Sequence, residues 1–322
     1  MKLFNNTKIA FSLKSDSELE RAFFLFKLIQ SQPMVKIGTA VTNFALKAHL
    51  PVEGLIRSTV FDHFCGGVTE EDCIHNIENM HSNGVYSVLD YSVEGNETEK
   101  QFDLVKTKTL KNIEFAKKKD SIPFVVFKPT GVGRFSLYQK ITEKKSLSNE
   151  EKSEWINVMN RYYEICDKAI KYDVPILIDA EESWIQDAAD QLVEVLMEKY
   201  NVNKAIVFNT LQMYRHDRMD YLKELHQKAL KGNYHIGLKI VRGAYMEKER
   251  ERAIENKYPS PICIDKNATD KNFNDAIKFI MEHDKMALFA GTHNEDSSYL
   301  LLDLAKRHNI NSNDNRLWFG QL

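Results

Sequence analysis

The first part of the chain shows apolar residues at helical spacing, interrupted by prolines. One such stretch covers residues 17–32 and stops at Pro33, and a second covers 35–50 and stops at Pro51. Proline lacks the backbone N–H and clashes with the preceding turn, so it is rare inside a helix. The pattern therefore predicts two helices that end at these prolines.

Two further helical signals follow before the pattern changes. A stretch over 52–64 is apolar at helical spacing, and the segment from Thr69 to Asp72 is typical of a capped helix start. We expect these helices to form an N-terminal arm over residues 1–68 and a separate catalytic domain to occupy 69–322.

From about residue 85, short apolar runs alternate with longer helical stretches. Continuous apolar runs predict parallel strands that are covered on both faces. The stretches over 149–172 and 183–200 carry an apolar stripe at i, i+3, i+4 and i+7, which predicts helices. The predicted strands are VYSVLD (85–90), PFVVFK (123–128), PILIDA (175–180), AIVFNT (205–210), HIGLKI (235–240), MALFAG (286–291) and RLWFGQ (316–321).

This alternation predicts an α/β fold, a (β/α)8 barrel of the TIM type that is one unit short. A doubly wound open sheet is the alternative, and the polar residues distinguish the two. Barrel active sites are assembled from the carboxyl ends of several strands, whereas an open sheet gathers such residues at one switch point. Here six strands carry a polar residue at or just after their ends: Asp90, Lys128, Asp179, Asn209, Lys239 and His293.

Composition narrows the possible functions. With 43% hydrophobic and 28% charged residues, the chain can bury a core, and its net charge of -2 gives no basic face for nucleic acid. Its four cysteines form no C-x-x-C pair, so we expect free thiols, and we predict no metal site. We expect neither a signal peptide nor a membrane span, since no apolar run is long enough.

The strand ends suggest two kinds of site. Lys128 and Lys239 lie opposite Asp179, and a cationic barrel mouth suits an anionic ligand. The carboxylates that follow the third strand could instead cap the next helix, a role that Ser183 fits better than Asp179. Asn294 is the predicted N-cap of a later helix, whose N-terminus could bind phosphate beside His293.

Several of these segments together resemble the proline dehydrogenase family, in its order and spacing over about residues 55–322. The matching segments are TVFDHFCGG (59–67), FKPT (127–130), LIDAEES (177–183), NTLQMYRHD (209–217), LKIVRGAYMEKER (238–250), YPSPICIDKNATDKNFNDAI (258–277) and AGTHNEDS (290–297). The resemblance implies a barrel that holds FAD non-covalently and oxidises L-proline to Δ1-pyrroline-5-carboxylate, passing electrons to a quinone. In such an enzyme the flavin carries the redox chemistry and the protein positions the reactants.

The resemblance also implies roles for individual residues. Lys128 would bind the proline carboxylate, Asp179 would pair with Lys128 and line the site, and Lys239 would lie beside the reactive edge of the flavin, where many members carry arginine. Tyr245 would cover the substrate pocket, and Leu322 would line it. The expected cofactor contacts are Ala180, Gln212, Lys239, Arg242, Gly243, Ala244, Thr292 and His293.

Other features of the family remain expectations. An eighth strand and a final helix with two adjacent arginines would follow Leu322, and we expect this sequence to be a fragment that lacks them. Hydroxyproline is an alternative substrate. A barrel lyase that forms a Schiff base through Lys128 or Lys239 is an alternative of another class, and a non-enzymatic binding module is a third. We expect a cytoplasmic or, in a eukaryote, mitochondrial protein, with peripheral contact to the inner membrane and oligomer formation as further options.

Overall fold

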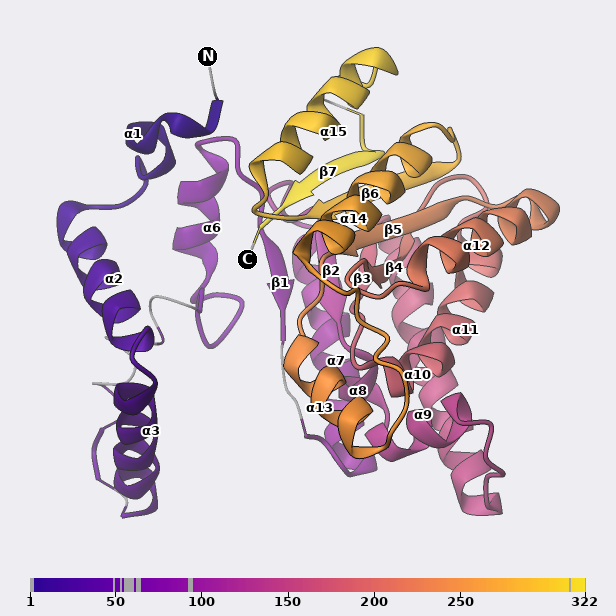
Figure 1. Cartoon of the computed structure of the whole chain (residues 1–322), viewed down its shortest axis with the longest axis horizontal. Helices are drawn as coiled ribbons and strands as arrows, with labels where there is room; N and C mark the ends of the chain where they lie inside the picture. Colours follow the sequence, from indigo (N-terminus) through magenta and orange to yellow (C-terminus); the bar gives the residue numbers. More distant parts are fainter. Residues whose placement is uncertain are drawn as a thin grey trace. The chain divides into compact units, whose positions relative to one another are not determined.

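The computed structural model describes residues 3–48, 50–52, 54, 61, 65–91, 95–312 and 314–321 (Figure 1). Its chain divides into two compact units, Met1–Ser87 and Val88–Leu322. The domain boundary expected at residue 68 stays a prediction. Among the described residues, no helix is both long and apolar enough to cross a membrane.

The N-terminal unit is helical, as the sequence predicts. The structure places Pro33 in the first turn of its second long helix, where a missing N–H costs nothing, so this helix starts three residues before the predicted 35–50. The predicted helix over 52–64 lies mostly outside the described residues. The helical elements are η1 (Leu3–Asn5), α1 (Thr7–Ala10), α2 (Asp16–Ile29), α3 (Gln32–Lys47) and α6 (Ile74–His81).

The capping bonds predicted at Thr69 to Asp72 are present, but the regular helix begins a few residues later than predicted. The Asp72 N–H donates to Thr69 Oγ1 over 3.2 Å, and the Thr69 N–H donates to Asp72 Oδ2 over 3.2 Å. These reciprocal bonds close a turn whose residues 70–73 lead directly into the helix. Helix α6 begins afterwards, at Ile74.

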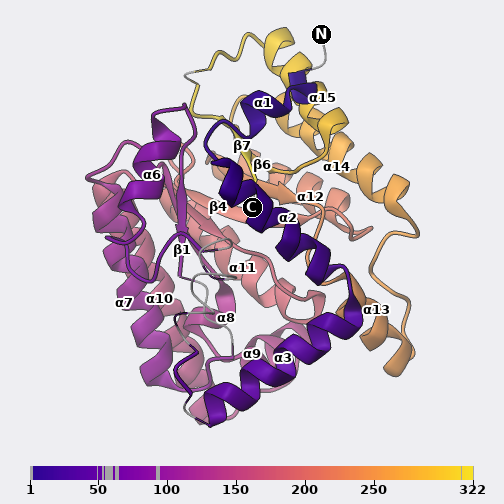
Figure 2. The ribbon, with the colours of Figure 1, turned by 90° about the vertical axis from the view of Figure 1, so that its left-hand side faces the viewer.

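The second unit contains the seven predicted strands, all confirmed within three residues at each end, in one parallel sheet whose order follows the chain. The sheet curls into part of a (β/α)8 barrel. In Figure 2, α7 and α10 lie at the β1 end of the sheet, and α14 and α15 lie at the β7 end. The strands are β1 (Val88–Asp90), β2 (Phe124–Phe127), β3 (Ile176–Ile178), β4 (Val207–Gln212), β5 (Ile236–Val241), β6 (Met286–Gly291) and β7 (Leu317–Gly320).

Helices cover the outside of this sheet, with α7 packed on β2, α11 on β4 and α14 on β6. The two helices predicted at 149–172 and 183–200 are confirmed with the same bounds. The helices of this unit are α7 (Glu99–Ala116), α8 (Pro129–Val132), α9 (Phe135–Thr142), α10 (Asn149–Tyr172), α11 (Ser183–Tyr200), α12 (Arg218–Gly232), α13 (Met246–Glu255), α14 (Lys266–Met281) and α15 (Glu295–Arg307).

Two predictions about helix caps have opposite outcomes. Asn294 caps α15 as predicted, since its Oδ1 accepts the Ser297 N–H over 2.9 Å. Ser183 does not cap α11 but is its first residue, and both its N–H and its hydroxyl donate to the Glu249 carboxylate over 2.6 Å. The start of α11 is therefore capped by a carboxylate from α13, which lies 66 residues away in the sequence.

Alternate residues of the strands fill the inside of the barrel with aromatic rings. The Phe124 ring meets the rings of Phe208, Phe289 and Trp318 edge to face, with centroids 5.3, 5.3 and 5.2 Å apart. Gly237 on β5 leaves room for this layer, because a Cβ there would lie 2.7 Å from the Phe208 ring. Val126, Leu177 and Ala287 complete the cluster.

The same alternation places the polar residues. Successive side chains of a strand point to opposite faces, so residues two apart share a face. Since Val126 and Leu177 point into the core cluster, Lys128 and Asp179 follow them on the inner side, at the carboxyl ends of β2 and β3. Lys239 follows Gly237 on β5 in the same way.

This core predicts a clear contrast between two leucine-to-alanine substitutions. Leu177 is 1% exposed within the barrel, so Leu177→Ala should lower the free energy of unfolding by about 2–5 kcal/mol. Leu230 on α12 is 57% exposed, and Leu230→Ala should change it by less than about 0.5 kcal/mol. Urea unfolding followed by circular dichroism measures both, and equal losses would contradict the assignment of Leu177 to the barrel core.

Candidate active site

One carboxylate lies between two lysines at the inner strand ends. Lys239 Nζ is 2.6 Å from Asp179 Oδ1, and Lys128 Nζ is 3.3 Å from Asp179 Oδ2. Only 14–16% of each of the three side chains is exposed. The predicted ion pair between Lys128 and Asp179 is present, and Lys239 joins it. Two ammonium groups share one carboxylate, which leaves a net positive group suited to an anion.

The charge of Lys128 is set by two opposing effects. Burial disfavours its charged form, but the carboxylate of Asp179, with those of Asp90 and Glu181, outweighs burial and raises the Lys128 pKa. Lys128 is therefore an ammonium group at neutral pH. In that form it can bind a carboxylate, but it lacks the lone pair that a Schiff-base nucleophile needs.

Glu181 is a second carboxyl group of this region, to which the sequence analysis gave no role. Its side chain accepts the Thr130 N–H over 2.9 Å and the Thr130 hydroxyl over 2.6 Å. Burial raises the pKa of Glu181 to about 7, although both hydrogen bonds favour the charged form. The segment Asp-Ala-Glu-Glu marks these residues in the sequence, but their partner lies 51 residues away.

Gln212, a predicted cofactor contact, ends β4 and is 3% exposed. Its Nε2 donates to the backbone carbonyl of Glu181 over 2.7 Å, and its Oε1 accepts the Ala244 N–H over 3.1 Å. Gln212 thus connects the ends of β3 and β5. An amide has a second N–H and a second lone pair, so these bonds leave it able to contact a ligand.

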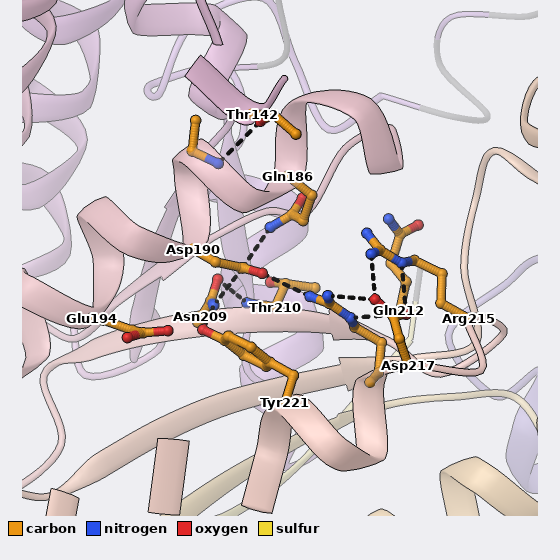
Figure 3. A network of polar contacts seen from close by, with 12 residues as sticks. Thr142, Gln186, Asp190, Glu194, Asn209, Thr210, Gln212, Arg215, Asp217 and Tyr221 are labelled. Atoms are coloured by element: carbon orange, nitrogen blue, oxygen red, sulfur yellow. Dashed lines mark hydrogen bonds and ion pairs between the residues drawn. The ribbon is translucent and has the colours of Figure 1, made fainter. Parts of the chain in front are cut away.

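Asn209 was expected at a strand end, and the structure places it elsewhere. Strand β4 runs to Gln212, two residues beyond the predicted run, so Asn209 lies in mid-strand. It faces outward, because its neighbour Phe208 faces the barrel core. Its side-chain amide donates to Asp190 of α11 over 2.9 Å. Figure 3 shows Asp190 between Asn209 and Gln186, so Asn209 joins a buried network behind the sheet.

That network continues into the loop after β4 (Figure 3). Arg218 donates to Asp190 over 2.6 Å and to Asp217 over 2.9 Å, and Arg215 donates to Asp217 over 2.6 Å. Burial of Asp217 favours its neutral form, but these two guanidinium groups hold its pKa well below the usual range. The network anchors the loop that follows Gln212.

A second cationic group lies at the N-terminus of α15. Arg242 donates to Asp270 over 2.6 Å, to the Thr292 hydroxyl over 2.7 Å and to the Ser297 hydroxyl over 3.0 Å. The structure thus brings together two predicted cofactor contacts, Arg242 and Thr292. His293 is exposed beside them. A guanidinium group at a helix N-terminus is suited to a phosphate group.

The turn after Arg242 requires glycine because of its backbone conformation and a close contact within the protein. Gly243 has a φ of 141°, and a Cβ there would lie 2.5 Å from the ring of Tyr214. The Tyr214 N–H donates to the Arg242 carbonyl over 2.6 Å, so the two strand ends stay paired. The contact between Tyr214 and Gly243 could not be predicted from the sequence, because only the fold brings the two residues together.

The remaining predicted residues lie around this region. Ala180 is half-buried between Asp179 and Glu181, Ala244 follows Gly243, and Tyr245 is half-buried as the N-cap residue of α13. Leu322, expected to line the substrate pocket, lies outside the described residues. The predicted site residues that the structure describes therefore form two clusters, one around Asp179 and one around Arg242.

Comparison with known proteins shows what the chain resembles. The carbapenem antibiotics biosynthesis protein CarD of Pectobacterium carotovorum is 34% identical over 89% of this chain and 74% of that protein. The mitochondrial proline dehydrogenase 1 of Dictyostelium discoideum is 28% identical over 100% of this chain and 64% of that protein.

A solved structure supports the fold. The proline utilization A protein of Bdellovibrio bacteriovorus, inactivated by N-propargylglycine, matches with a TM-score of 0.73 and 18% identity, over 100% of this chain and 34% of that one. The chain thus spans about a third of that protein, and the predicted (β/α)8 barrel type is confirmed. The family model for proline dehydrogenase matches residues 73–322. The chain belongs to the proline dehydrogenase family.

Proposed function

We propose that this chain oxidises L-proline to Δ1-pyrroline-5-carboxylate with non-covalently bound FAD and passes the electrons to a quinone. The observation that carries the proposal is the group of Lys128, Asp179 and Lys239 at the inner strand ends, which offers two ammonium groups to an anionic substrate. Relatives named proline dehydrogenase support the substrate class.

The residues of the second cationic group fit the diphosphate of FAD. Arg242 uses three hydrogen bonds to hold its position, and a guanidinium group has further N–H donors for a phosphate. Thr292 and the first turn of α15 lie beside it, and exposed His293 follows Thr292. In this proposal Arg242, Thr292 and His293 hold the diphosphate, Gly243 and Ala244 follow the chain of the cofactor, and Ala180, Gln212 and Lys239 contact its ring.

The protein's part in the reaction is positioning. A bound flavin would supply the acceptor for the hydride that leaves proline C5. Lys128 binds the substrate carboxylate, and Asp179 fixes the Lys128 ammonium group in place. Tyr245 covers the substrate, Leu322 lines the pocket, and the aromatic layer below keeps water out. The ring amine must be neutral before the hydride leaves C5. Holding the carboxylate fixes where C5 lies, so orientation contributes much of the rate.

The alternatives gain less support. A lyase that uses Lys128 as a nucleophile conflicts with its raised pKa. A binding module gains less support because the residues expected for substrate and for cofactor occur together, namely Lys128, Asp179, Gln212, Arg242 and His293. Hydroxyproline is the second candidate substrate, because its carboxylate would bind to the same group of charges. We further propose a cytoplasmic or mitochondrial location, with peripheral contact to the inner membrane and an oligomeric state as options.

The first prediction from this proposal concerns flavin reduction. The purified protein should show flavin absorption bands, and L-proline added without oxygen should bleach them. Bands that persist with L-proline but bleach with hydroxyproline would favour the second candidate. Folded protein that binds no flavin when FAD is added would contradict the proposal.

The second prediction concerns the carboxylate anchor. Lys128→Met removes one charge-assisted contact, worth about 1.5–3 kcal/mol, so the Kd for L-proline should rise roughly 10- to 100-fold while flavin content stays constant. Lys204→Met is the matched control, because Lys204 is 58% exposed and pairs with Asp173 on the surface. The Kd is measured from the dependence of the rate of anaerobic flavin bleaching on proline concentration in single-turnover experiments. An unchanged value for Lys128→Met would contradict the anchor role.

A further inference from the structure

We propose that Glu181 is a positioning residue that fixes Lys128 for substrate binding by joining the ends of four strands. The inference rests on the proposed function, since it assigns Lys128 to the substrate carboxylate. It concerns a side chain that reaches neither substrate nor cofactor but acts through the turn that carries Lys128.

The side chain of Glu181 holds the turn after β2. Its carboxylate accepts both the N–H and the hydroxyl of Thr130, two residues beyond Lys128. Lys128 is the N-cap residue of the short helix α8, and its own side chain makes no capping bond. The first turn of a helix has N–H groups without partners, and Glu181 satisfies one of them from another strand. The direction of Lys128 therefore depends on Glu181.

The backbone of Glu181 extends this connection to two more strands. Its N–H donates to Gln186 on α11 over 2.9 Å, and its carbonyl accepts from Gln212 at the end of β4. Gln212 in turn accepts the Ala244 N–H after β5. One chain of hydrogen bonds, Thr130–Glu181–Gln212–Ala244, thus links β2, β3, β4 and β5.

This chain joins the ends of the three strands that carry the charged group. Lys128 lies two residues before Thr130, and Asp179 lies two residues before Glu181, directly after the end of β3. Lys239 lies on β5, five residues before Ala244. The ion pairs between these side chains fix their separations, and the hydrogen-bond chain fixes the backbones from which they extend.

The environment of Glu181 makes this connection sensitive to pH. Its side chain is 4% exposed, and burial raises its pKa to about 7. The charged and titratable groups around it are Lys128, Glu182, Tyr138 on α9 and Tyr162 on α10. Burial raises the pKa of both tyrosines, so they stay neutral. Protonation of Glu181 removes an acceptor for Thr130 and a negative charge near Lys128, so the positioning should weaken below about pH 7.

The test compares four variants of the flavin-loaded protein. Glu181→Ala and Thr130→Val should raise the Kd for L-proline about tenfold at pH above 7, with unchanged flavin content. Glu181→Gln keeps the shape and one acceptor but not the charge, so its Kd should lie between those of the wild type and Glu181→Ala. Glu114→Ala is the control, because Glu114 is exposed on α7 and pairs with Lys168 away from Thr130, and its Kd should stay within about twofold. An unchanged Kd in Glu181→Ala would overturn the inference.

The pH profile separates positioning from a general structural role. The amine of proline titrates equally in the wild type and in Glu181→Gln. The ratio of the wild-type affinity to the Glu181→Gln affinity therefore reports the effect of Glu181 alone. This ratio should fall as the pH decreases through about 7, where the wild type protonates Glu181. A ratio that is constant with pH would contradict a role for the Glu181 charge.

Stability should depend on pH in the opposite sense. The pKa of Glu181 rises from 4.5 in the unfolded chain to about 7 in the folded one, so the folded state binds the proton more tightly. The wild type should therefore lose stability relative to Glu181→Gln as the pH rises from about 5 to about 8. Urea unfolding at both pH values measures this difference, and a constant difference would contradict the assigned titration.

A readout that needs no substrate keeps the inference distinct from the proposed function. Labelling with acetic anhydride, followed by mass spectrometry, reports the reactivity of each lysine. Lys128 should react several-fold faster in Glu181→Ala, while exposed Lys204 serves as the internal control. If proline fails to reduce the wild-type flavin but Lys128 shows this change, the proposed function fails and the positioning role stands. Equal reactivity of Lys128 in both proteins would overturn the positioning role.

Discussion

The sharing of Asp179 by two lysines is the interaction on which the candidate site depends. Each of the three side chains is about 85% buried, and burying a lone charge to that extent would shift its protonation rather than keep it ionised. Asp179 makes the burial of Lys128 and Lys239 possible, and they do the same for Asp179. Without the carboxylate, two like charges would face each other in the barrel mouth. The net positive charge that can bind a ligand thus depends on the carboxylate of Asp179, which stabilises the two buried ammonium groups.

The aromatic layer beneath these charges strengthens them. Phe124 packs edge to face against three other rings. The absence of a side chain at Gly237 leaves room for the ring of Phe208. Such a layer excludes water from below, and the lower local polarity makes each ionic contact stronger than it would be in solvent. The alternation of strand residues produces both layers at once, because the position two residues beyond a core residue lies on the same inner face.

That alternation also explains which features the sequence predicts. The apolar runs and the stripe of 183–200 are local patterns, so seven strands and this helix follow from them. Asn209 was misplaced because β4 ends two residues later than predicted, which puts Asn209 in mid-strand. It faces outward because its neighbour Phe208 faces the barrel core. Glu181 and Tyr214 were missed for another reason. Their partners, Thr130 and Gly243, lie far away in the sequence, and no local pattern shows which residues come into contact.

Two carboxyl groups on one strand end therefore have different tasks. Asp179 contacts two ammonium groups, whereas Glu181 contacts the neutral donors of Thr130 within a buried environment that raises its pKa to about 7. Environment rather than residue type brings the pKa of Glu181 near neutral pH. The ionised Glu181 destabilises the fold in the same pH range in which it positions Lys128 best. A residue kept for packing alone would not need to be ionisable, since a glutamine at this place could hold Thr130 without that cost. The presence of a carboxyl group at this buried position is therefore better explained by its effect on Lys128 than by its contribution to stability.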